Sequence, residues 1–419
     1  MHNIHFDNAS NIFKKVYELV QQKKIASAIS YLNLIIDNYP DVAATAYHYK
    51  GYIYFEKIKD FPSARKNYSK AIEFNLSYCE AYISRAVLYR YDLDLDKALA
   101  DISIALQFQP DNATALFNKA IILLSMGQYE LGWELFESRL KLYPRLTPSF
   151  LIGQRWNGMG EVSDKTLMIY TGHALGTSIQ FFRYLPIVLK IFRKVILYLP
   201  PQLNIIAQSF GQVQIINTTP KKQQFDYFCS LLSLPHLLKN SIQTIPNILP
   251  YINLSQTYLL KWQEFLDTPK RKRIGIAWRG ERQQMNDKNS SMPLMAMHPL
   301  MKLDADIYLL NKDISEEDYT LLHPFENIKD YTELFASLED TAALMHQLDY
   351  IVTVDNTIAH LAGALNLNVL ILLPYNADFR WLQTGTDSTW YPCAQLFRQI
   401  RRSDWEKPIQ DILKLIGSM

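Results

Sequence analysis

A repeat organises the first third of the chain, and this feature constrains the fold most. Small residues recur there in two sets, at spacings of 34 to 36 positions: Ala28, Ala64, Ala98 and Gly132, and Gly51, Ala86 and Ala120. Such a period predicts paired helices that cross closely at small residues and stack into an array. We expect four repeats between about residues 10 and 144, with one extra residue near positions 59–62.

The tyrosines of this region follow the same period, so we interpret them as packing residues rather than ligand contacts. They are Tyr47, Tyr54, Tyr68, Tyr82 and Tyr89. An array of paired helices also has a concave surface, which usually binds a peptide or a protein. The sequence therefore predicts a protein partner on the concave face.

After residue 144 the pattern changes to short apolar runs separated by helical segments. The runs are 165–170, 194–200, 213–218, 273–278, 306–311, 350–355 and 368–374. Strands that are apolar on both faces and alternate with helices are typical of parallel sheets covered on both sides. We predict two doubly wound lobes.

The expected organisation is multidomain, because 419 residues exceed one ordinary domain and 48% of them are hydrophobic. An all-α array over 1–146 is followed by a linker over 147–163 and by two α/β lobes, over 164–268 and 269–419. The final helical run of the second lobe has the length to pack back onto the first lobe.

Composition excludes several classes of protein. The formal net charge is only +2 and no dense Lys/Arg stripe is present, which argues against nucleic-acid binding. Three cysteines lie far apart without a CxxC pair, so neither a disulfide framework nor a zinc site is expected. With no signal-peptide pattern and no transmembrane segment, we expect a cytoplasmic location. Peripheral contact with a membrane and homo-oligomer formation stay open.

The first candidate site is the glycine-containing turn at 171–180. Glycines there let the backbone approach a ligand, and the start of a helix offers free N–H groups. An ordinary strand-to-helix turn would need the same glycines, so the turn alone does not decide between the two interpretations.

Three further candidates follow strands of the second lobe. Asp355 ends the run 350–355 and is followed by Asn356 and Thr357, and Lys312 follows 306–311. Capping groups and an ammonium at the carboxyl edge of a sheet form a phosphate cradle, although a plain N-cap and a solvated lysine explain them as well. The third is the polar loop after 273–278, with Arg279, Gly280, Asn286 and Asp287.

Metal ligands are not expected, because no histidines are spaced to share a helix face with a carboxylate. Trp278 is either lobe core or a wall of the cleft.

The motifs of the α/β region resemble glycosyltransferase family 9, the heptosyltransferase-like GT-B enzymes, and the repeats look like tetratricopeptide repeats. The segment FASLEDTAALMHQLDYIVTVDNTIAHLAGALNLNVLILLP, followed by FRWLQTGTDSTWYP and LFRQ, is similar to the second lobe of that family. GHALGTSIQFFRYLP is similar to its first-lobe motif, and IAWRGERQQMNDKNSSMPL and LLNKD to two others. Bacterial members with a fused repeat domain are the best likeness.

The resemblance implies a GT-B fold with two Rossmann-like lobes. It implies a nucleotide-sugar co-substrate and no cofactor, with the donor held by the second lobe near Lys312 and the helix start at Asn356–Thr357. Asp355, Thr357 and His360 match the family's Asp-Thr-Ser-x-x-His motif. The acceptor would face Gly176–Gln180.

The catalytic side departs from the family. Thr177 stands where the family carries the aspartate that deprotonates the acceptor, and Ser290-Ser291 replaces an Arg-Ser pair. His173 lies in the same turn, and a histidine side chain is suited to proton transfer near neutral pH, although it could instead merely cap the turn, with Thr177 capping the helix.

Together these features predict a bacterial, inverting, metal-independent glycosyltransferase that acts on a protein or a glycolipid, with the repeats docking a protein. The alternative is a catalytically impaired scaffold that binds a protein or a sugar nucleotide.

Overall fold

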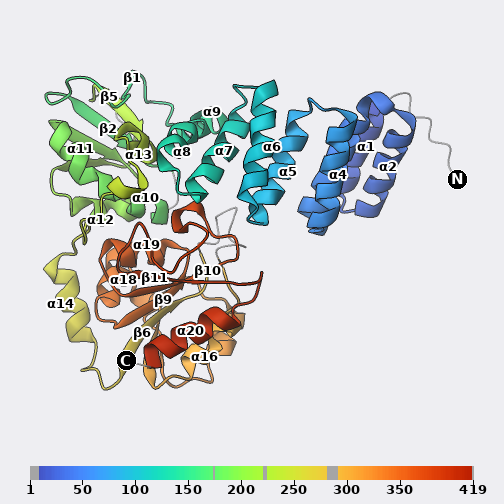
Figure 1. Cartoon of the computed structure of the whole chain (residues 1–419). Helices are drawn as coiled ribbons and strands as arrows, with labels where there is room; N and C mark the ends of the chain where they lie inside the picture. The colour runs from blue at the N-terminus through green and yellow to red at the C-terminus, as the bar shows by residue number, and fades with distance from the viewer. Residues whose placement is uncertain (1–8, 173–174, 220–223, 281–290, 418–419) are drawn as a thin grey trace. The chain divides into compact units, whose positions relative to one another are not determined.

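The computed structural model describes residues 9–172, 175–219, 224–280 and 291–417 (Figure 1). Two compact units are present. One contains residues up to 126 together with 134–142, and the other contains 127–133 together with 143 onward. Among the described residues, no helix is both long enough and apolar enough to cross a membrane.

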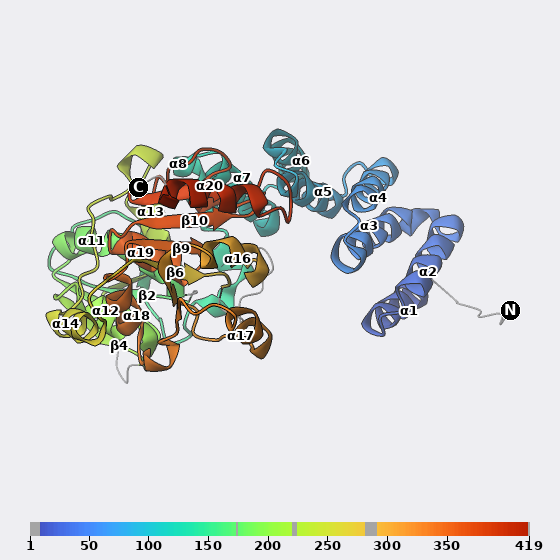
Figure 2. The ribbon, with the colours of Figure 1, turned by 90° about the horizontal axis from the view of Figure 1, so that it is seen from below.

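The first unit consists of helices that pair with their neighbours in the chain (Figures 1 and 2). They are α1 (Ala9–Gln21), α2 (Ile25–Asn38), α3 (Ala43–Ile53), α4 (Phe61–Phe74), α5 (Cys79–Tyr91), α6 (Leu95–Phe108), α7 (Ala113–Ser125) and α9 (Arg139–Leu142). Helix α8 (Tyr129–Phe136) spans the boundary between the units. The paired helices predicted from the repeat are present.

Local chemistry explains these helices. Gly51 lies where a Cβ atom would be 2.5 Å from the Tyr68 ring, so the close crossing of α3 and α4 requires a glycine. The side chains of Asp60, Asp94 and Asn112 accept backbone hydrogen bonds and cap α4, α6 and α7. A π-helical turn at Tyr54–Ile58 directly precedes positions 59–62, where the sequence predicts the extra residue.

The second unit holds two parallel sheets. The first contains β1 (Gln154–Arg155), β2 (Thr166–Tyr170), β3 (Lys194–Tyr198), β4 (Val213–Ile216) and β5 (Tyr227–Ser230), in the order β1-β5-β2-β3-β4. Its helices are α10 (Leu175–Phe181), α11 (Leu185–Ile191), α12 (Asn204–Gln208) and α13 (Leu234–Leu237). Every residue of β2 is buried, as expected for a strand covered on both faces.

The second sheet has the order β11-β10-β9-β6-β7-β8. Its strands are β6 (Lys272–Ala277), β7 (Ala305–Leu309), β8 (Ile328–Lys329), β9 (Tyr350–Val354), β10 (Val369–Leu373) and β11 (Ala394–Arg398). Numbered from β6, this is the order 3-2-1-4-5-6 of nucleotide-binding sheets, in which ligands bind where the strand order reverses. Here that point lies between β6 and β9. The parallel α/β content is confirmed, and the GT-B assignment and the domain boundaries stay predictions.

Helices cover this second sheet (Figures 1 and 2). They are α14 (Gln256–Phe265), α16 (Leu294–Met301), α17 (Glu316–Leu322), α18 (Leu338–Met345), α19 (Thr357–Ala364) and α20 (Glu406–Gly417). The final helix, for which the sequence left a return to the first lobe open, packs against α16 and β11 of the second sheet.

Candidate functional site

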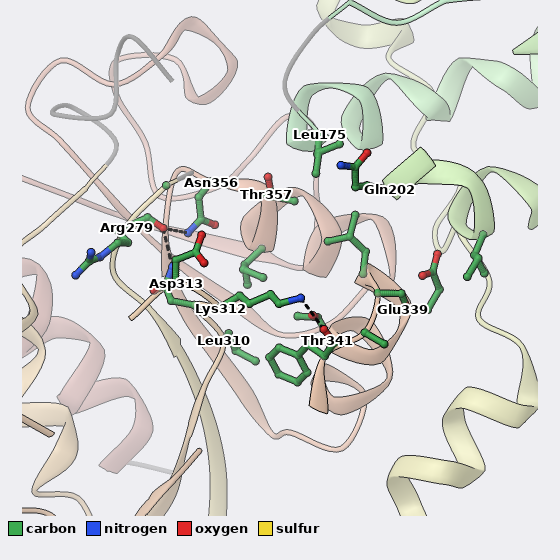
Figure 3. A pocket seen from close by; sticks show the side chains of 18 of the residues that line it. Leu175, Gln202, Arg279, Leu310, Lys312, Asp313, Glu339, Thr341, Asn356 and Thr357 are labelled. Carbon is green, nitrogen blue, oxygen red and sulfur yellow. Dashed lines mark hydrogen bonds between the residues drawn. The ribbon is translucent and has the colours of Figure 1, made fainter. Parts of the chain in front are cut away.

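A cavity of about 370 Å³ lies at the carboxyl ends of β6, β7 and β9 (Figure 3). Arg279, Gly280, Lys312, Asn356 and Thr357, which follow these three strands, line it together with the segment 335–339. The first lobe contributes Leu175, Pro201, Gln202 and Ile205. The cavity thus lies at the point where the strand order of the second sheet reverses.

Hydrogen bonds to one carbonyl group tie the three strand ends together. The backbone oxygen of Arg279 accepts from Asn356 Nδ2 at 3.0 Å and from Asn311 Nδ2 at 3.0 Å. Asn356 Oδ1 also accepts from the backbone N–H of Ala359 at 3.1 Å, so Asn356 caps α19. The capping interpretation is therefore correct for Asn356, and the cap fixes the first turn of α19 at the cavity wall.

Lys312 is the cation that extends along the cavity. Its Nζ donates to the backbone oxygen of Phe335 at 2.8 Å (Figure 3). Arg279 also lines the cavity, but its side chain extends away from the other labelled residues and pairs with Asp318. The Asp318 carboxylate also accepts from Trp278 Nε1 at 3.4 Å. Trp278 is 1% exposed and lines a separate hollow, so it is a core residue here.

Asp355 and His360 lie outside the cavity. His360 stacks on Trp381, with ring centroids 5.5 Å apart, and its Nδ1 is 3.0 Å from the hydroxyl of Tyr391. Burial lowers the pKa of His360 well below its usual value, and two nearby arginines add to this shift, so the ring is neutral. Burial raises the pKa of Asp355 to about 6, helped by the Asp378 carboxylate and opposed by Arg380. Asp355 can thus hold or release a proton near neutral pH.

Gly176, Thr177 and Gln180, which were predicted to face the acceptor, lie where α10 of the first lobe packs against the second lobe. We call this contact the joint. Arg380 donates to Gln180 Oε1 at 2.7 Å and to Thr177 Oγ1 at 3.3 Å. Gln180 is fully buried, and a Cβ atom on Gly176 would lie 2.9 Å from His360 Cδ2. Close packing of α10 on α19 therefore requires the glycine.

A second arginine stabilises the same joint. Arg183 donates to the backbone oxygens of Gln180 and Trp390, at 2.9 and 2.7 Å. Its guanidinium lies 4.8 to 5.1 Å from the ring centroids of Tyr251, Trp390 and Tyr391. Arg183 is 2% exposed. It holds the lobes together through carbonyls and ring faces.

Three predicted site residues, His173, Asn286 and Asp287, lie outside the described residues. Within the described ranges, no group of His, Cys, Asp and Glu side chains is arranged to hold a metal ion.

Several cavity residues, Asp313 among them, were not predicted from the sequence, and Glu339 is the most deeply buried charged residue of this group. It lies in the first turn of α18, is 2% exposed, and lines the cavity. The spacing of Ser337 and Asp340 is typical of a helix start and could have located this turn. Nothing in the local sequence indicates that Glu339 is buried against a cavity.

No protein-family profile matches the chain. Protein FlbA of Caulobacter vibrioides is 23% identical over 377 residues, which are 81% of this chain and 61% of FlbA. The chain thus spans about three fifths of the length of that relative.

Solved structures of both kinds are similar to the chain. A glycosyl transferase family 9 structure from Veillonella parvula is 10% identical and covers 62% of this chain and 92% of its own, with a TM-score of 0.42. A tetratricopeptide repeat protein from Parabacteroides merdae is 20% identical and covers 32% of this chain and 54% of its own, with a TM-score of 0.29.

Proposed function

We propose that the chain is a glycosyltransferase that holds a nucleotide-diphosphate sugar in the cavity of the second sheet. The observation that carries the proposal is that Lys312 and the first turn of α19 line the same cavity. This cavity lies at the point where the strand order reverses. Free N–H groups at a helix start and an ammonium attract phosphate. The diphosphate would lie over Asn356–Thr357.

Lys312 has a partner that a phosphate can replace. Its ammonium now donates to the Phe335 carbonyl, which is a neutral acceptor. A phosphate oxygen is charged, and charge-assisted hydrogen bonds are about twice as strong as neutral ones. We therefore expect Lys312 to turn from the carbonyl to the diphosphate when the donor binds.

Replacing this lysine tests the proposed site. Lys312→Ala should weaken nucleoside diphosphate binding about tenfold or more, the effect of one charge-assisted hydrogen bond of roughly 1.5–3 kcal/mol. Isothermal titration calorimetry of the full chain measures it, with the exposed Lys302→Ala as the control. Equal affinity in both variants would place the diphosphate elsewhere.

The proposed reaction is a single displacement with inversion. The acceptor oxygen forms a bond to the anomeric carbon while the bond from that carbon to the diphosphate breaks. Lys312 and the α19 N–H groups stabilise the leaving diphosphate, so the scheme needs no metal. The acceptor proton passes to a base, for which His173 is our candidate. The acceptor is a protein or a glycolipid.

A second candidate function is a binding scaffold without transfer activity. The observation that favours it is the hydrogen bond of Thr177. Its hydroxyl accepts from Arg380 in the joint between the lobes. The residues that the first lobe contributes to the described cavity wall include no carboxylate. Such a chain would bind the nucleotide sugar without deprotonating an acceptor.

The repeats would dock the protein that carries or delivers the acceptor. The first unit supports this role because it has its own buried clusters, around Ile12–Ile53 and Ala71–Ile122. The isolated repeats, residues 1–146, should retain an acceptor protein in a pull-down that residues 155–419 lose. Equal capture by both fragments would contradict docking.

A further inference from the structure

Helix α8 places two aromatic side chains in the core of the second unit. Tyr129 and Trp133 are 2% and 1% exposed, and both belong to the second unit, although their sequence lies in the fourth predicted repeat. The same helix continues into the first unit, where Phe136 packs on Phe117 of α7 with ring centroids 5.5 Å apart. One helix of the repeat region therefore also belongs to the α/β unit.

Trp133 packs on both lobes at the joint. Its ring meets Phe181 of α10 and Phe379 of the second lobe edge to face, with centroids 5.8 and 5.7 Å apart. A third edge-to-face contact, at 6.3 Å, joins it to Trp390. Such aromatic pairs are favourable beyond the area that they bury. The ring therefore fixes how α10 lies against the segment 379–390.

The two phenylalanines that Trp133 contacts are chain neighbours of residues that connect the lobes. Phe181 follows Gln180 in α10, and Phe379 precedes Arg380. Arg380 Nε donates to Gln180 Oε1 at 2.7 Å. The first residue of α10 also lines the donor cavity. A shift of α10 would therefore move the acceptor-side turn relative to the donor.

Tyr129 holds the other end of the same segment. Its hydroxyl accepts a hydrogen bond from Trp390 Nε1 at 3.2 Å, and the two rings lie 6.0 Å apart. Trp390 in turn contacts Arg183, whose guanidinium lies 5.0 Å from the ring centroid and donates to the Trp390 carbonyl. Helix α8 thus supports the segments that carry both partners of the joint arginines.

We propose that Trp133 is a positioning residue for sugar transfer, which holds α10 and the segment 379–390 in place so that the acceptor meets the anomeric carbon of the donor. The inference rests on the proposed function and gives a helix of the repeat region a part in it. Because the donor would be held by Lys312 and the first turn of α19, Trp133 should affect turnover rather than donor affinity. Misplacing a reacting group by about 1 Å can cost about a hundredfold in rate.

Kinetics and calorimetry on the full chain test this role, with ADP-, UDP- and GDP-sugars as donors. Trp133→Leu should lower turnover at saturating donor by about tenfold to a hundredfold, while the dissociation constant of the donor changes less than about twofold. Trp133→Phe keeps an aromatic ring and should recover a large part of the turnover. Tyr129→Phe, which removes only the hydroxyl that accepts from Trp390, should lower turnover about threefold.

Leu131→Ala is the matched control, because Leu131 lies in the same helix and is 44% exposed. It should behave like the wild type. Thermal unfolding of each variant checks the fold, and Tyr129→Phe decides the question if Trp133→Leu does not fold. Turnover that is unchanged in these variants, or that falls only in proportion to donor affinity, would overturn the inference alone. Absence of turnover by the wild type with every donor would overturn the proposed function with it.

Discussion

Arg183→Ala should lower the free energy of unfolding of the second unit by about 3–5 kcal/mol. The substitution empties a buried space and leaves the backbone oxygens of Gln180, Pro246 and Trp390 without this donor. It also removes a guanidinium that lies over three aromatic rings. Arg183→Lys should give a smaller loss, because one ammonium cannot reach all three carbonyls.

Tryptophan fluorescence during urea unfolding measures this effect. All seven tryptophans belong to the second unit, so the signal reports the unfolding of that unit. The exposed Arg193→Ala is the matched control and should change stability by less than about 0.5 kcal/mol. Equal unfolding midpoints for Arg183→Ala and Arg193→Ala would show that the joint does not stabilise the unit.

His173→Ala should lower sugar transfer by about 10²–10⁴-fold while donor affinity stays intact, if His173 takes the acceptor proton. This is the usual contribution of a general base and corresponds to roughly 3–5 kcal/mol in the barrier. Steady-state turnover together with calorimetry separates the two quantities. Unchanged turnover would assign His173 to the turn rather than to proton transfer.

Thr177→Asp distinguishes the enzyme from the scaffold. The new carboxylate would lie beside Arg380, which already donates to Thr177 Oγ1 at 3.3 Å. Raised transfer would indicate a transferase whose usual base has been lost. Donor binding without transfer in both the wild type and Thr177→Asp would favour the scaffold.

The sequence was sufficient to predict the repeating helices and the buried strands, because both depend on local periodicity. The apolar runs at 165–170 and 368–374 contain β2 and β10, every residue of which is buried. Strands β1 and β8 were missed because each has only two residues, too few for any pattern. The short β5 and the partly polar β11 were missed as well.

The residues of the cavity could be predicted only in part, because local sequence patterns locate strand ends but not packing between the lobes. Lys312, Asn356 and Thr357 could be placed together because each follows a parallel strand, and such strands end at one edge of a sheet. Gln180 and His360 contact partners from distant segments in the joint, and no local pattern encodes packing between lobes. The burial of Glu339 against the cavity depends equally on three-dimensional packing.

The most direct test of the proposed function is donor turnover by the purified full-length chain. ADP-, UDP- and GDP-sugars are each incubated with the protein, with and without candidate acceptors, and release of nucleoside diphosphate is measured. The account predicts that at least one donor is consumed with inversion at its anomeric carbon, and that Lys312→Ala reduces consumption at limiting donor about tenfold or more while Lys302→Ala does not. The account would be contradicted if no donor is turned over and calorimetry detects no binding of any nucleotide.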